Sequence, residues 1–70
     1  MRYAVVIERL ATGFSAYVPD LPGCIATGAS IDEVELRIRE AILFHIEGLR
    51  QDGAVVPPPS SQVEYVDIAA

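Results

Sequence analysis

Two residues of this 70-residue sequence could together supply nucleophilic chemistry: Cys24, the only cysteine, and His45, the only histidine. A histidine within hydrogen-bonding reach of a thiol can activate it as a nucleophile. However, Cys24 follows a glycine turn at the start of an expected strand, where a small buried cysteine is ordinary. His45 falls on the apolar stripe of an expected helix, where a lone histidine usually belongs to the core or its edge. One cysteine and one histidine cannot form a standard zinc site, so structural roles are predicted for both.

Acidic side chains are the other candidates for chemistry, because a two-metal nuclease needs several carboxylates that converge on its ions. The acids of this chain are scattered: Glu8 in the first expected strand, Asp20 in a loop, and Asp32 and Glu40 on the expected helix. Asp20 is expected to cap the turn around it, and the helix acids are expected to serve capping and solvation. The chain is therefore predicted not to be an enzyme, and neither a metal nor another cofactor is expected.

The charge balance indicates the class of partner. The formal net charge is −5, from ten acidic residues and five arginines, and there is no lysine. Because nucleic-acid backbones are anionic, direct binding of DNA or RNA by this chain is not expected. An acidic surface suits a basic protein partner instead.

Size and composition predict one domain, residues 1–70, that associates with copies of itself. A core in a chain below about 70–80 residues rarely supplies more than about 3–5 kcal/mol of stability. Hydrophobic residues make up 51% of the sequence, more than so small a core can hide. Since the lone Cys24 cannot form an internal disulfide, self-association is the remaining source of stability, and a homo-oligomer (a dimer or a tetramer) is expected.

Nothing in the sequence indicates a membrane or an export route. Met1-Arg2-Tyr3 leads directly into an alternating pattern, without the long apolar segment of a signal peptide. No uninterrupted apolar run approaches membrane-spanning length, and a single cysteine suits a reducing compartment. A cytoplasmic protein without membrane association is therefore expected.

Alternating apolar residues predict four strands. The expected ranges are Tyr3–Glu8, Phe14–Val18, Cys24–Gly28 and residues 62–68. Ala11-Thr12-Gly13 is expected to join the first two strands as a hairpin, with Gly13 at a positive φ. The last segment carries apolar residues on both faces, so either both faces are covered or a bulge shifts its register.

The segment Pro19–Cys24 is expected to form a rigid corner between the hairpin and the rest of the chain. Pro19 and Pro22 fix their own φ and exclude both helix and central strand. Gly23 can adopt a positive φ that other residues avoid. Leu21 is apolar inside this loop, so it is expected to tuck under the fold and anchor the corner, which is also a candidate surface for a partner.

One long helix is predicted from about Ile31 to Asp52, stopping at Gly53. Ser30 and Glu33 form a capping box, in which the Ser30 hydroxyl accepts from the amide three residues on and Glu33 reaches back. At 100° per residue, one face of the helix gathers the expected core stripe: Ile31, Val34, Ile38, Ala41, Ile42, His45 and Leu49.

The order β-β-β-α-β predicts an α+β fold, with one antiparallel sheet packed by one long helix. Val6 and Tyr17 are expected on the sheet face that points away from the helix, and this face is apolar enough to need a cover. On the back of the helix, Leu36 and Leu43 lie seven residues apart, with Phe44 on their flank. They form a candidate contact patch, although single exposed leucines are common. Oligomer or partner contact and plain surface exposure both remain open for this patch.

Several motifs of this chain occur together in one known family. The most specific is the block Pro19-Asp20-Leu21-Pro22-Gly23-Cys24 followed by a capped helix. The others are Tyr3-Ala4-Val5, an aromatic at Phe14 or Tyr17, the pair Thr27 and Gly28, Asp32-Glu33, Glu40-Ala41-Ile42, Glu47-Gly48-Leu49 and Pro57-Pro58-Pro59. Over nearly its whole length the sequence thus resembles the HicB-like family, the antitoxins of bacterial and archaeal toxin–antitoxin pairs.

This resemblance implies a β-β-β-α-β domain of the partial ribonuclease-H-like or double-stranded-RNA-binding-like kind. It also implies neutralisation of a small basic RNA-cleaving (HicA-like) toxin, whose RNA-binding face and catalytic histidine the antitoxin would cover. The residues expected to contact the toxin are Glu8, Asp20, Leu21, Pro22 and Gly23. The residues expected at an oligomer contact are Val6, Tyr17, Leu36 and Leu43.

The sequence departs from the complete family pattern at its end. Many HicB-like antitoxins carry a C-terminal helix-turn-helix or ribbon-helix-helix that binds promoter DNA, whereas this sequence ends at Ala70, two residues after the last expected strand. A short, single-domain member without its own DNA-binding domain is therefore expected. An alternative function is that of a solo oligomeric domain with a structural or regulatory role and no toxin.

Overall fold

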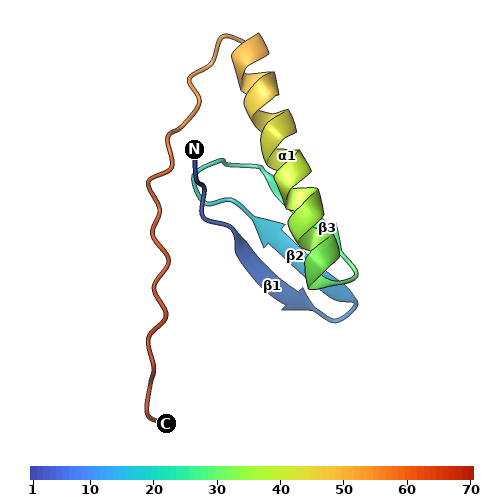
Figure 1. Ribbon diagram of the computed structural model, residues 1–70, viewed down its shortest axis with the longest axis vertical. Helices are drawn as coiled ribbons and strands as arrows, with labels where there is room; N and C mark the ends of the chain where they lie inside the picture. The colour runs from blue at the N-terminus through green and yellow to red at the C-terminus, as the bar shows by residue number, and fades with distance from the viewer.

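The computed structural model describes residues 1–70 and contains three strands followed by one helix. The elements are β1 (Val6–Leu10), β2 (Gly13–Tyr17), β3 (Ile25–Gly28) and α1 (Ile31–Gln51). The strands form one antiparallel sheet in the order β1-β2-β3. The helix lies across one face of this sheet, and the chain after it runs down beside the body as a long extended segment (Figure 1). The predicted α+β class and the order of the first four elements are confirmed, although β1 begins at Val6 and not at the predicted Tyr3.

The strand register separates the two faces of the sheet. Ala16 in β2 pairs with Ile7 in β1 and with Ala26 in β3, and its burial places this row on the helix side. The next row, Tyr17 with Val6 on one side and Ile25 on the other, points to the opposite face. No helix covers that opposite face within this chain (Figure 1).

The core lies between the sheet, the corner loop and the helix. It consists of seven buried residues: Ala16, Val18, Leu21, Cys24, Val34, Ile38 and Ile46. Leu21 and Val34 have no exposed surface at all (0% each). Leu21 therefore anchors the corner loop inside the fold as the sequence predicts.

The helix begins and ends at the predicted signals. The Ser30 hydroxyl accepts a hydrogen bond from the Glu33 amide at 3.1 Å. At the other end Asp52 is the cap and Gly53 has a φ of 69°, which an L side chain rarely adopts. The amide of Ala54 then donates to the carbonyl of Leu49 at 2.9 Å, which closes the last turn.

Two positions of the helix stripe differ from the prediction. Ile31, the first helical residue, is exposed, and the buried cluster begins one turn later at Val34. Ile46 is buried although it falls outside the stripe expected at 100° per residue. Val56, which follows the helix, packs against the same core. The core therefore includes the chain that returns after the helix, a contact that helix periodicity alone does not predict.

Glycine at two positions permits the close approach of helix and sheet. A Cβ on Gly28 would lie 2.7 Å from the amide nitrogen of Val34, a distance that Cβ atoms do not tolerate. A Cβ on Gly13 would lie 2.5 Å from the carbonyl oxygen of Gly28. The φ of Gly13 is 152°, which confirms the positive φ predicted for this residue. The start of α1, the end of β3 and the start of β2 are therefore held together by backbone contacts.

The prediction of a fourth strand at residues 62–68 is wrong for this structure. The chain after the helix is extended, but it pairs with neither β1 nor β3. Tyr65 is 93% exposed and Ile68 is 77% exposed. Alternation of apolar residues indicates a strand-forming segment, but a strand also needs a hydrogen-bonding edge beside it. Here the segment leaves the body at an angle to β1 (Figure 1), so neither a covered double face nor a bulge arises.

Candidate partner-binding surfaces

The corner loop is closed by three backbone hydrogen bonds. The Val18 amide donates to the Cys24 carbonyl at 3.2 Å. Within the loop, the Leu21 amide donates to the Val18 carbonyl at 3.1 Å, and the Cys24 amide donates to the Leu21 carbonyl at 3.0 Å. Gly23 has a φ of 84°, the positive value predicted for it. The loop therefore presents Pro22 and Gly23, which are exposed, from a base fixed by the buried Leu21 and Cys24.

The carboxylate of Asp20 binds the chain that follows the helix. Its Oδ2 accepts from the amides of Ser60 and Ser61, both at 2.9 Å. Its Oδ1 accepts from the hydroxyls of Ser60 at 3.0 Å and Ser61 at 2.8 Å. The sequence predicted that Asp20 caps its own turn, and this prediction is wrong. Asp20 instead joins the corner loop to residues forty positions away. These hydrogen bonds, that of the Ser61 amide first, lower the pKa of Asp20 from 3.8 to about 2.

Cys24 and His45 form no catalytic pair. No hydrogen bond joins them: Cys24 is buried in the core beside the loop, whereas His45 lies on the helix flank next to Phe44 and Leu49. Burial raises the pKa of the Cys24 thiol, which disfavours the thiolate that nucleophilic chemistry requires. Cys24 therefore contributes to packing, as predicted.

The carboxylates likewise do not converge. No group of three or more histidine, cysteine, aspartate or glutamate residues is placed to hold a metal ion. Glu33 pairs with Arg37 at 2.8 Å, and the same arginine donates to the Thr27 carbonyl at 3.1 Å. Glu8 lies opposite Ser15 on the uncovered face of the sheet. The single helix, α1, is not both long and apolar enough to cross a lipid bilayer.

Two apolar surfaces match the residues predicted for an oligomer contact. On the uncovered sheet face, Val6, Tyr17 and Ile25 form one row across all three strands, and both Tyr17 and Ile25 are exposed. On the back of the helix, Leu36 is 56% exposed, and Leu43, two helical turns further along the same side, is exposed as well. Ile25 belongs to the first surface although only Val6 and Tyr17 were predicted there, because its alternation with the helix-facing Ala26 places it on the uncovered face.

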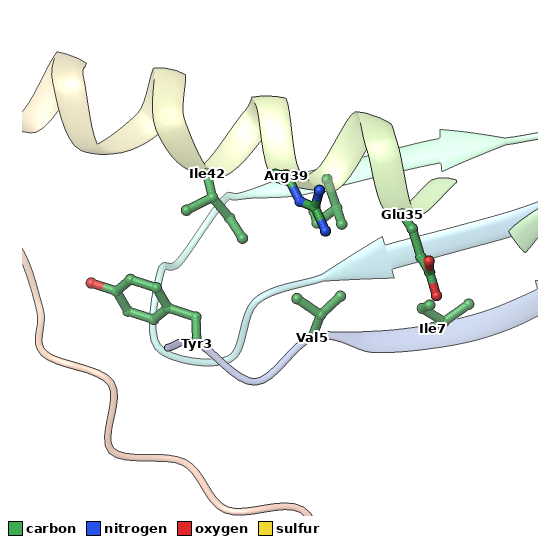
Figure 2. A pocket seen from close by; sticks show the side chains of 7 residues that line it. Tyr3, Val5, Ile7, Glu35, Arg39 and Ile42 are labelled. Carbon is green, nitrogen blue, oxygen red and sulfur yellow. The ribbon is translucent and has the colours of Figure 1, made fainter. Parts of the chain in front are cut away.

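A third apolar surface is a slot between the outer edge of β1 and the helix. This β1 slot has a volume of about 370 Å³, and Figure 2 shows its lining side chains. Tyr3, Val5 and Ile7 point from the β1 side toward the helix, where Ile42 points toward Tyr3. The other lining residues are Ile38, Glu35 and Arg39. No sequence signal singled out this slot, because its lining comes from two segments, residues 3–7 and 35–42, that only the fold brings together.

Comparison with known proteins places this arrangement in a family. Residues 3–69 match a family described as the HicB-like antitoxin of bacterial toxin–antitoxin systems. An uncharacterised 14.9 kDa protein of Haemophilus phage HP1 is 37% identical over 67 residues, which are 96% of this chain and 50% of that protein. The antitoxin HicB 2 of Photorhabdus laumondii is 28% identical over 71 residues, 100% of this chain and 51% of that protein. The chain thus spans about half the length of these two relatives.

The fold agrees with the sequence match. The solved structure of a HicA3 and HicB3 toxin-antitoxin complex contains a chain that superposes on this one with a TM-score of 0.74 at 33% sequence identity. The superposition covers 84% of this chain and 70% of that chain. From the family match over residues 3–69 and this shared fold, the chain belongs to the HicB-like antitoxin family.

Proposed function

We propose that this chain binds a small basic HicA-like toxin that cleaves RNA and neutralises it by covering its active face. The observation that carries the proposal is the superposition of this chain on a component of a toxin–antitoxin complex. The net charge of −5 supports the choice of a basic partner, because opposite charges speed encounter and select the partner. The chain acts in this proposal as a binding protein and not as an enzyme.

We place the toxin contact at the corner loop and the neighbouring sheet. The exposed Pro22 and Gly23 would meet the toxin directly, and Glu8 would add negative charge from the uncovered sheet face. Leu21 has no exposed surface, so its role in this contact is to hold the loop in shape. Asp20 is occupied by Ser60 and Ser61, so its role is to fix the returning chain beside the loop.

Co-expression with a HicA-like toxin, taken from the reading frame beside the gene of this chain, tests the proposal. The toxin alone should stop growth, this chain should restore it, and the two should purify together in a fixed ratio. Loss of RNA cleavage by the purified toxin on addition of this chain would confirm neutralisation. If the chain neither binds the toxin nor inhibits cleavage, the proposal is wrong.

Charge reversal locates the contact. Glu8→Arg should weaken binding of the toxin, whereas Glu47→Arg, an equal charge change on the exposed helix surface, should weaken it much less. Equal affinities of the two variants would argue against the proposed position on the sheet.

A second candidate function is a solo oligomer with a structural or regulatory role. It is supported by the apolar row Val6, Tyr17 and Ile25 and by the exposed Leu36 and Leu43, which are typical of surfaces that other proteins cover. Purification from the native cells separates the candidates: a small basic protein at a fixed ratio favours the antitoxin, and self-association alone favours the solo oligomer.

A further inference from the structure

The segment after Ser61 has the pattern of a strand but belongs to no sheet. Every residue from Gln62 to Ala70 is exposed, and the large apolar residues among them are Val63, Tyr65, Val66 and Ile68. Ser60 and Ser61 are held by Asp20, so the segment leaves the body at a fixed point. We refer to residues 62–68 as the tail strand.

The β1 slot is an unfilled place for a strand of this kind. β1 is at the edge of the sheet, and the outward N–H and C=O groups of an edge strand are free to pair with another chain. Above this edge, the apolar side chains of Val5, Ile7 and Ile42 line the slot that the alternate residues of an added strand would enter (Figure 2).

We propose that the tail strand of one copy adds to the outer edge of β1 in a second copy, and that the exchange is reciprocal. The tail leaves the body close to this edge, because Ser61 and Val63 line a hollow of about 480 Å³ together with Arg2 and Ala4. From there it diverges from β1 of its own copy (Figure 1). Each copy offers one tail strand and one slot, so a two-fold dimer satisfies both, as in other exchanges of identical elements.

The unpaired Arg39 supports this occupant. The slot is lined by two charged residues, Glu35 and Arg39, and Arg39 forms no ion pair within the chain, since the only salt bridge joins Glu33 and Arg37. The tail strand carries Glu64 and Asp67 and no basic residue. A tail strand in the slot therefore brings a carboxylate to an unpaired guanidinium. The free edge of β3 lies on the opposite side of the sheet from the tail root.

The mass of the chain in solution tests the exchange without any toxin, so its outcome is independent of the proposed function. Light scattering should give twice the monomer mass of 7.6 kDa. Deletion of residues 62–70 should give a folded monomer, because these residues make no contact with the core. Deletion of residues 69–70 alone is the matched control and should leave the dimer intact. A full chain that is monomeric would overturn the proposal and would leave the slot to a different protein. A deletion variant that remains dimeric would overturn it as well.

A point variant and a mixed-label measurement complete the test. Tyr65→Pro keeps the length of the chain but removes a backbone donor, so it should also yield a monomer with an unchanged circular-dichroism spectrum of the body. In a dimer of one isotope-labelled and one unlabelled copy, nuclear Overhauser contacts between Tyr65 and the residues of the β1 slot should appear between the two copies. Contacts confined to one copy would show that the tail fills its own slot, and the exchange would be wrong.

Discussion

The strand β2 and the tail strand have similar sequence patterns but opposite environments. In β2 the alternation of Phe14 and Ala16 with Ser15 and Tyr17 lies between two hydrogen-bonded neighbours, and Ala16 is 1% exposed. In the tail strand a comparable alternation has no neighbour, and Tyr65 remains exposed. The difference shows that alternation determines which segments can form strands, whereas hydrogen bonding to the edge of a neighbouring strand determines which segments do.

This contrast divides the molecule into a body that holds itself together and a tail that needs a partner. The body has a continuous core of seven buried residues drawn from the sheet, the corner loop and the helix. The tail strand contributes nothing to that core and is tied to the body mainly through Asp20. Changes in the body should therefore alter the free energy of unfolding, and changes in the tail should alter association.

The largest effect on stability is expected from Leu21→Ala. The removed side chain is completely buried, so the variant should lose about 2–5 kcal/mol of unfolding free energy. Leu36→Ala is the control, because Leu36 is exposed on the helix and its loss should change stability by less than about 0.5 kcal/mol. Urea denaturation of both variants measures the difference. Equal losses would mean that the corner loop is not anchored by Leu21.

A smaller effect is expected where the backbone of β3 meets the helix. Gly28→Ala places a Cβ 2.7 Å from the Val34 amide nitrogen, and relief of this clash should cost about 1–3 kcal/mol. Gly48→Ala is the matched control, since a Cβ on Gly48 meets nothing within 4 Å. In a helix interior that change should stabilise the protein by about 0.5–1 kcal/mol. Thermal unfolding should therefore shift in opposite directions, and shifts in the same direction would contradict the close contact.

Two serine substitutions, one in the body and one at the anchor of the tail, compare the effects of losing single hydrogen bonds. Ser30→Ala removes the helix N-cap and should cost about 1 kcal/mol of unfolding free energy. Ser60→Ala removes one of the hydroxyl bonds to Asp20 and should leave the unfolding free energy within about 0.5 kcal/mol. Chemical denaturation measures both. The division would be contradicted if Ser60→Ala destabilised the body as much as Ser30→Ala.

The smallest effect is a pH dependence of the tail anchor. Because the pKa of Asp20 is lowered from 3.8 to about 2, the anchor is fully present above about pH 4. It weakens as the pH falls through about 2, where the carboxylate becomes protonated in the folded chain and ceases to accept four hydrogen bonds. Amide chemical shifts of Ser60 and Ser61 should titrate in this range. A midpoint near 3.8 would mean that the anchor does not form in solution.

The body could be predicted from the sequence because its signals are local. Ser30 and Gly53 mark the helix ends through backbone chemistry at those positions, and Leu21 is the apolar residue of a loop that two prolines make rigid. The burial of Ile46 was missed because its angular position lies outside the expected stripe, and the cluster that contains Ile46 also packs against Val56 of the returning chain.

The candidate surfaces could be predicted only in part. Val6 and Tyr17 lie on the uncovered face because strand alternation fixes the side on which they point. The anchor from Asp20 to Ser60 could not be found, since hydrogen bonds across forty residues leave no local pattern. The β1 slot could not be found either, because its lining side chains come from residues 3–7 and from the helix, which lie far apart in the sequence.

Residue-resolved amide hydrogen exchange, measured on the full chain at a low and a high protein concentration, tests this division of the molecule most directly. The body amides should be protected equally at both concentrations. The amides of residues 62–68 should exchange freely in dilute solution and become protected as the concentration rises, because their protection comes from a second copy. Protection of the tail that is independent of concentration would contradict the account, since the tail would then be a strand of its own sheet.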